Sequence, residues 1–183
     1  MKIFNKFLVF TIAIVAFSSL SVNAQGLSNG VSTAALENKI YKKILSLPYY
    51  EVYDFIGFSL NGGTVTLTGQ AKNGTNRKSA ENVVEDIPGV TSVVNNIEIL
   101  PPSGFDDNIR RNLYARISNT GGLSGYLWPV NPDVRLIVDG GHITLEGNVR
   151  NRGDYNLMNI IARGVFGSFS VTNNLKIEND RPS

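Results

Sequence analysis

The sequence predicts an α+β protein made of two tandem αββαβ modules, each a three-stranded sheet with two helices packed on one face. Three observations lead to this prediction: a long internal repeat, two amphipathic helix patterns in each copy, and a glycine-containing hairpin in each copy. We expect the first module at residues 33–100 and the second at residues 104–178.

The internal repeat is the strongest of these signals. When the chain is shifted by 78 residues, residues 60–99 align with residues 138–177 without a gap, and twelve of the forty pairs are identical. The identical positions are Gly62, Gly63, Thr66, Leu67, Gly69, Asn73, Gly89, Ser92, Val93, Asn95, Asn96 and Ile99. The first helices match instead at a shift of 73, so the second copy has five extra residues before its first strand. A repeat that preserves glycines, apolar residues and an Asn-Asn pair together indicates duplication of one folding unit.

Each copy contains two patterns in which apolar residues recur every three or four positions, as on one face of an amphipathic helix. The first helices carry Leu36, Ile40, Ile44 and Leu47 in one copy and Phe105, Ile109, Leu113 and Ile117 in the other. The second helices carry Ala80, Val83, Val84 and Ile87, matched by Met158, Ile161, Ala162 and Val165. Gly89 and Gly167 follow these second helices, at the position where glycine commonly ends a helix.

A tight hairpin connects the first two strands of each copy. Apolar residues alternate on both sides of Asn61-Gly62-Gly63 and of Asp139-Gly140-Gly141. Asn-Gly and Asp-Gly supply the positive φ angles that such turns require. The last strands are expected at residues 92–99 and 170–177, and Asn95 in the first of them has the parity of its apolar neighbours. This parity predicts a bulge or a hydrogen-bonded buried amide, because a buried polar group needs a partner.

The first 24 residues have the features of a secretory signal peptide. Lys2 and Lys6 precede an apolar run at residues 7–17, and Val22-Asn23-Ala24 fits the small-residue rule for signal peptidase. An apolar run of about 11 residues is too short for a stable bilayer span. We therefore expect cleavage after Ala24 and a periplasmic protein, with an uncleaved anchor as the alternative.

Composition excludes several classes of function. The chain has no cysteine, which removes disulfides, thiolate metal sites and the cysteine that a lipoprotein anchor requires. It has 17 basic and 15 acidic residues, so removal of Lys2 and Lys6 with the signal leaves 15 of each. A neutral mature chain argues against nucleic-acid binding, and any charge-driven binding has to come from a local patch.

The two copies resemble the BON family of bacterial envelope proteins. The resemblance rests on the strand segments 65–69 and 143–147, on the helix that follows each of them, and on the Gly-Val-x-x-Val-x-Asn-x-Ile ending at residues 89–97. The second ending departs from this pattern at Ser168. The resemblance implies the αββαβ fold, a periplasmic location, a role in envelope integrity or osmotic stress, and contact with anionic phospholipids. No catalytic residue comes with it.

Aromatic residues next to proline are candidates for a binding surface. Tyr126, Leu127 and Trp128 lie in the lengthened loop of the second copy, before Pro129, and Tyr49 and Tyr50 follow Pro48 at the corresponding place in the first copy. Such residues suit a membrane interface or a protein partner. The alternative is that the rings cap the core between helix and sheet, as aromatic residues commonly do.

Arg110 and Arg111, on the first helix of the second copy, are candidates for contact with an anionic lipid surface. Asp106 and Asp107 precede them on the same helix. The alternative is therefore an exposed helix face of mixed charge.

The sequence contains no convincing catalytic or metal-binding pattern. His142 is the only histidine and has no cluster of ligands around it. Neighbouring acidic residues on a helix point in different directions and do not form an acid–base pair. We expect no enzyme activity, no metal and no cofactor.

The function that we expect is a peripheral, non-transmembrane binding protein of the periplasm, which contacts an anionic phospholipid surface or envelope proteins and helps maintain the envelope, including under osmotic stress. The alternative is a periplasmic chaperone or scaffold that holds protein clients.

Overall fold

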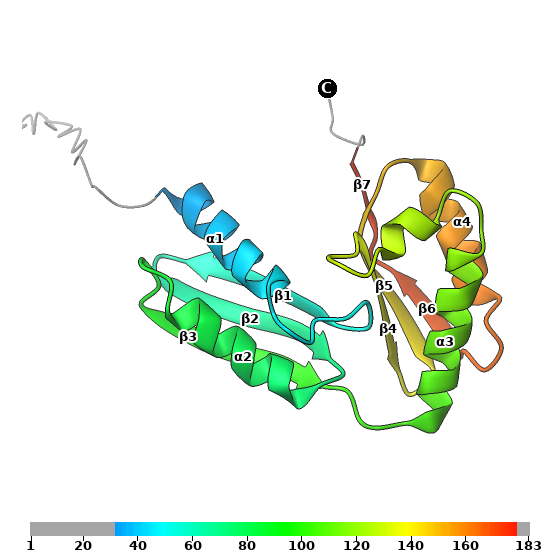
Figure 1. The fold of residues 1–183 in the computed structure, drawn as a ribbon, viewed down its shortest axis with the longest axis horizontal. Helices are drawn as coiled ribbons and strands as arrows, with labels where there is room; N and C mark the ends of the chain where they lie inside the picture. The colour runs from blue at the N-terminus through cyan, green and yellow to red at the C-terminus, as the bar shows by residue number, and fades with distance from the viewer. Residues whose placement is uncertain (1–31, 179–183) are drawn as a thin grey trace, which may run out of the picture.

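The computed structural model describes residues 32–178 and contains the two predicted modules (Figure 1). The predicted signal peptide lies outside the described residues. The first module consists of α1 (Thr33–Leu45), β1 (Phe55–Asn61), β2 (Thr64–Ala71), α2 (Gly74–Glu85) and β3 (Ser92–Ile99). The second consists of α3 (Gly104–Ser118), a short 3₁₀ helix η1 (Ser124–Leu127), β4 (Val134–Asp139), β5 (His142–Val149), α4 (Arg152–Arg163), β6 (Ser170–Asn173) and β7 (Lys176–Ile177). The predicted α+β fold of two αββαβ modules is confirmed.

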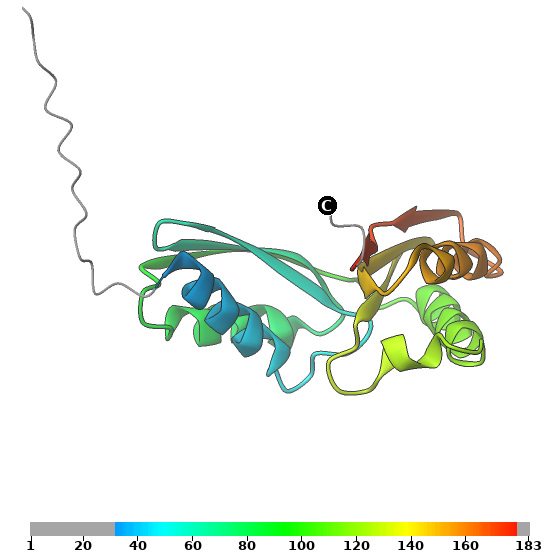
Figure 2. The same ribbon diagram turned by 90° about the horizontal axis from the view of Figure 1, so that it is seen from above.

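Both sheets have the same topology, with the second strand in the centre. In the first module β1 is antiparallel to β2, and β3 returns parallel to β2 after the α2 crossover. Two helices cover one face of this sheet (Figure 2). The second module repeats the arrangement, but its last strand is interrupted, so that β6 and β7 pair separately with β5. The single strand predicted at residues 170–177 is in this respect wrong.

The predicted apolar faces form two separate cores. Leu36, Ile40, Ile44 and Leu47 are buried against β1, β2 and α2, whereas Ile109, Leu113 and Ile117 are buried in the second module. The prediction was wrong at Phe105, which is half-exposed. Phe105 lies in the first turn of α3 and packs against Phe169, with 5.8 Å between the ring centroids, rather than into the core.

The repeated asparagines tie the last strand of each module to its second helix. The side-chain amide of Asn95 donates to the Arg77 carbonyl (2.9 Å), and Asn173 makes the equivalent bond to the Tyr155 carbonyl (3.4 Å). The side-chain oxygen of Asn95 accepts a hydrogen bond from the Ile97 N–H (3.2 Å). The prediction of a hydrogen-bonded amide at Asn95 is therefore confirmed, although the residue is only half-buried.

Gly69 is the glycine whose replacement we expect to be most harmful in the first module. It has φ +112°, and a Cβ at this position would lie 2.1 Å from the Phe55 carbonyl oxygen. We predict that Gly69→Ala lowers the free energy of unfolding by at least about 2 kcal/mol, since strain and a backbone clash act together. Urea unfolding followed by circular dichroism measures this change.

Gly74 provides the matched control, because it begins α2 and has open space around its Cα. Gly74→Ala should leave stability within about 0.5 kcal/mol of the parent protein or raise it slightly. Equal losses from the two substitutions would contradict the explanation given for Gly69.

Candidate functional site

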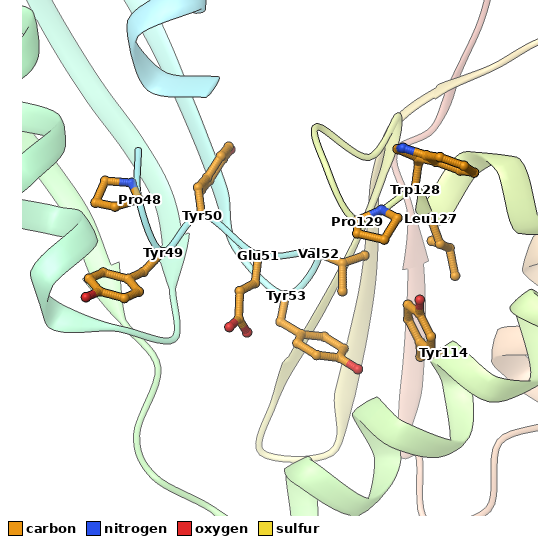
Figure 3. A pocket seen from close by; sticks show the side chains of 10 residues that line it. All are labelled: Pro48, Tyr49, Tyr50, Glu51, Val52, Tyr53, Tyr114, Leu127, Trp128 and Pro129. Carbon is orange, nitrogen blue, oxygen red and sulfur yellow. The ribbon is translucent and has the colours of Figure 1, made fainter. Parts of the chain in front are cut away.

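The most distinctive surface feature is a groove between the two modules, which we call the inter-module groove (Figure 3). Its volume is about 380 Å³. The residues that line it are Pro48, Tyr49, Tyr50, Glu51, Val52, Tyr53, Tyr114, Leu127, Trp128 and Pro129. One side comes from the segment between α1 and β1, and the other from η1 and α3. The groove thus brings together the two aromatic segments that the sequence placed at corresponding ends of the two copies.

The segment between α1 and β1 crosses to the second module and adds to the edge of its sheet. The Leu136 N–H donates to the Val52 carbonyl (2.8 Å), which continues the hydrogen bonding of β4 beyond its own module. Val52 and Tyr53 also pack against the second core. At a second point the Lys72 ammonium forms an ion pair with Asp107 (3.0 Å). The two modules are therefore docked through backbone, apolar and charged contacts.

Arg135 fixes this docking. It lies on β4 with its side chain on the face opposite Leu136, and it is 96% buried because only 4% of its surface is exposed. Its guanidinium donates to the Glu51 carbonyl (2.8 Å) and lies over the Tyr50 ring, 4.0 Å from the centroid. A cation held against an aromatic face and a carbonyl compensates for part of the loss of water.

Asp54 holds the end of the same segment in place. Its carboxylate accepts hydrogen bonds from the Glu51 N–H (2.9 Å), the Lys72 N–H (2.6 Å) and the Asn76 side-chain amide (3.0 Å). Burial raises the pKa of Asp54, and the two backbone hydrogen bonds oppose this rise. The three donors satisfy a buried carboxylate, as expected for a structural residue.

Tyr126 performs the corresponding task in the second module. Its hydroxyl donates to the Asp154 carboxylate and accepts a hydrogen bond from the Arg150 N–H (3.0 Å). Residues 150 and 154 are the counterparts of Lys72 and Asn76 at the shift of 78. Burial raises the pKa of Tyr126, and the hydrogen bond to Asp154 raises it further. Tyr126 is thus a core residue.

The predicted aromatic residues divide into exposed and buried ones. Tyr49 and Trp128 are 57% and 65% exposed. Tyr50 is half-buried under Arg135, and its hydroxyl accepts from the Ile56 N–H (2.9 Å). Tyr126 and Leu127 are buried. The prediction that these two residues form a binding surface is therefore wrong. They cap the core instead, which was the alternative.

The two predicted arginines also differ. Arg110 is buried, where its guanidinium forms an ion pair with Asp107 (2.8 Å) and donates to the Val138 carbonyl. Because it is buried, Arg110 cannot face a lipid surface. Its guanidinium instead links α3 to β4 through the Val138 carbonyl. Arg111 is exposed, with a hydrogen bond to Asn108. Asp106, expected on an exposed face, is buried and accepts from the Gly140 and Gly141 N–H groups (3.1 and 2.8 Å).

Sequence reasoning missed Tyr53 and Tyr114, whose rings meet in the groove with 6.5 Å between the centroids. It also missed two aromatic side chains at the far end of the second module, Phe166 and Phe169, which are 94% and 71% exposed. The repeat itself held the signal, since Phe166 and Phe169 occupy the positions of Pro88 and Thr91 in the first copy. A small residue in one copy that is replaced by a large aromatic residue in the other, at the same place in a loop, indicates that the surfaces of the two copies have diverged.

The lining of the groove is mostly aromatic and apolar. Within residues 32–178 no group of three or more His, Cys, Asp or Glu side chains is placed to hold a metal ion. Over the same range, no helix is both long and apolar enough to cross a membrane. What the groove offers is aromatic rings and two prolines, with Glu51 as its acidic group.

Comparison with known proteins identifies the two repeats. The family model described as "BON domain" matches residues 32–101 and 105–179. No protein with a curated description matches. Among solved structures, the C-terminal domain of CdsD, a structural protein of the type III secretion system of Chlamydia trachomatis, is 16% identical over 77% of this chain, with a TM-score of 0.30. The chain spans 63% of that structure.

A second CdsD structure is 14% identical over 81% of this chain and 99% of its own, with a TM-score of 0.28. Overall likeness this low supports no argument about this chain.

We predict that Arg135→Ala loosens the contact between the modules. The substitution removes the donor to the Glu51 carbonyl and the cation over the Tyr50 ring. The free energy of unfolding should therefore fall by about 1–3 kcal/mol. Hydrogen exchange at the Leu136 amide, which bonds to Val52, should accelerate more than exchange in the α1 helix. Arg163→Ala, at an exposed arginine of α4, is the control and should change neither quantity. Unchanged protection at Leu136 would show that Arg135 does not hold the docking.

Proposed function

The chain belongs to the BON domain family, and we propose that it is a periplasmic protein that contacts phospholipid membrane surfaces peripherally and helps maintain the envelope, including under osmotic stress. BON domains are associated with envelope or periplasmic proteins, and the family is generally non-enzymatic. The predicted signal peptide and its cleavage after Ala24 support the periplasmic location.

One observation supports the membrane contact above others. The tip of the loop after η1 projects Trp128 and Val130, which are 65% and 70% exposed, on either side of Pro129. Tyr49, also exposed, lines the same groove as Trp128. Tryptophan and tyrosine favour the interface between headgroups and hydrocarbon. Full burial of a large apolar side chain is worth about 1.5–3 kcal/mol, so this tip supports weak and reversible docking.

Among the predicted arginines, Arg111 remains available to assist that docking. It is exposed on α3, the helix that also supplies Tyr114 to the groove. A cation near an anionic headgroup region adds about 1 kcal/mol. Arg110 is buried and does not contact the membrane in this proposal; it only holds α3 in place.

A second candidate is a chaperone or scaffold that holds protein clients, and the exposed Phe166 and Phe169 favour it. The sheet edges do not. On the outer edge of β3 the Ile97 N–H bonds to Asn95, and Leu175 makes the same bond to Asn173 at 3.2 Å. One backbone N–H on each of these edges is thus occupied by the side chain two residues before it, which makes the edge a poorer template for a client strand. Suppression of client aggregation, lost in a Phe166→Ser/Phe169→Ser variant, would support this second function.

We predict that the mature protein sediments with phosphatidylglycerol vesicles and that Trp128 emission shifts to the blue on binding. Trp128 is the only tryptophan, so its emission reports on this loop alone. Trp128→Ala should weaken sedimentation by about tenfold, since roughly 1.5 kcal/mol of apolar burial is lost.

Val94→Ala is the matched control, because Val94 is an exposed apolar residue on β3, away from the groove. It should bind as the parent protein does. Absence of both sedimentation and a blue shift at low salt would remove the membrane function.

A further inference from the structure

A second hollow lies on the first module, between the ends of α1 and α2, with a volume of about 480 Å³. Its lining consists of Lys39, Lys42, Lys43, Ser46, Ile87 and Pro88. The three lysines are exposed, while Ile87 is buried and forms an apolar floor. We call the three side chains the lysine cluster. The chain as a whole is nearly neutral, so charge-driven binding needs a local patch of one sign. The lysine cluster is such a patch of positive charge.

The lysine cluster has little local compensation. The only acidic residue within α1 is Glu37, so the helix carries three basic residues against one acidic residue. Ion pairs between described residues join Lys72 to Asp107, Lys78 to Glu81 and Arg110 to Asp107, and none of them involves the cluster. The acidic residues at the end of α2, Glu85 and Asp86, therefore leave the three ammonium groups unpaired.

The duplication provides an internal comparison. At the shift of 73, the counterparts of Lys39, Lys42 and Lys43 are Asn112, Ala115 and Arg116. Arg116 is used internally, since its guanidinium donates to the Gly164 carbonyl. The fold thus forms with no free cation at these places in the second module. Cations in the last turn of a helix are favourable to its dipole, which accounts for Lys42 and Lys43 but not for Lys39, a turn earlier.

The position of the cluster relates it to the inter-module groove. Ser46 lines the lysine hollow and Pro48, two residues later, lines the groove. In Figure 2, α1, α2 and η1 lie on the same, lower side of the molecule. One flat surface that meets the tip of the η1 loop can in this geometry also meet the outer face of α1.

We infer that the lysine cluster is a docking site for the anionic phospholipid headgroups of a bilayer, and that it orients the first module against the membrane that Trp128 contacts. This inference rests on the proposed membrane function. It adds a site on the first module that binds anionic headgroups, whereas Trp128 belongs to the second module. Ammonium groups around an apolar floor match an interface in which phosphates lie above acyl chains. Each lysine at an anionic surface gives about a fivefold gain in affinity.

The test compares binding of the mature protein to two kinds of vesicle, one of phosphatidylcholine alone and one of equal parts phosphatidylcholine and phosphatidylglycerol. We expect the parent protein to prefer the anionic vesicles by at least tenfold at low salt and to lose this preference as salt rises. The variant Lys39→Gln/Lys42→Gln/Lys43→Gln should lose most of the preference and keep its affinity for phosphatidylcholine. Trp128→Ala should weaken binding to both vesicles and keep the preference.

The control variant is Arg77→Gln/Arg163→Gln/Lys176→Gln, which removes the same charge from exposed positions elsewhere. It should retain the preference. Equal losses in the two triple variants would overturn the inference, because net charge alone would then explain the preference. Binding that ignores phosphatidylglycerol, or a preference that survives the loss of the three lysines, would overturn it too while leaving the membrane function intact. Failure of the parent protein to bind either vesicle would remove both.

Discussion

The hydrogen bond between the Leu136 N–H and the Val52 carbonyl, with Arg135 stacked on the Tyr50 ring beside it, is the constraint on which the inter-module groove depends. Each module has its own core and topology, so neither needs this contact to define its fold. The groove, however, exists only because the segment between α1 and β1 leaves its own module and continues the edge of β4. The segment covers part of the β4 edge, and a covered edge is less open to pairing with another chain.

Duplication followed by local change explains how the two halves came to differ. Both modules must satisfy the backbone N–H that follows their second strand, at Lys72 and at Arg150. The first uses a carboxylate, Asp54, that accepts from an amide on the helix, whereas the second uses the hydroxyl of Tyr126, which donates to a carboxylate on the helix. Donor and acceptor have changed places while the geometry is kept. Such exchanges leave the fold intact and free the surface to diverge.

Local patterns predicted the fold well because helices and hairpins are encoded over a few residues. The spacing of Ile40 and Ile44 and the Asn-Gly and Asp-Gly turns needed no knowledge of the partner module. Phe105 misled because the apolar period continues past the end of the sheet, where a side chain has little core to enter. Arg110 and Tyr126 misled for a different reason. A charge or a hydroxyl near a predicted surface can still be buried when the fold supplies a distant partner, and Val138 for Arg110 and Asp154 for Tyr126 each lie 28 residues away along the chain.

The groove itself was only half visible in the sequence, since its two sides were recognised separately. Repeat analysis shows that two segments are equivalent but does not show that they meet. In this protein the longer connection of the second copy contains η1 and places Trp128 in the same groove as Tyr49. Tyr53 and Tyr114 escaped notice because neither stands next to a proline or in a lengthened loop.

A fixed arrangement of the modules matters for the proposed membrane contact because each individual contribution is small. One exposed tryptophan or one lysine supplies too little free energy for a lasting attachment. When a rigid body presents several such groups on one side, binding of the first brings the others to the surface without a further loss of translational freedom. The buried Arg135 therefore has a consequence beyond stability, since it determines whether aromatic and basic groups from different modules act together or one at a time.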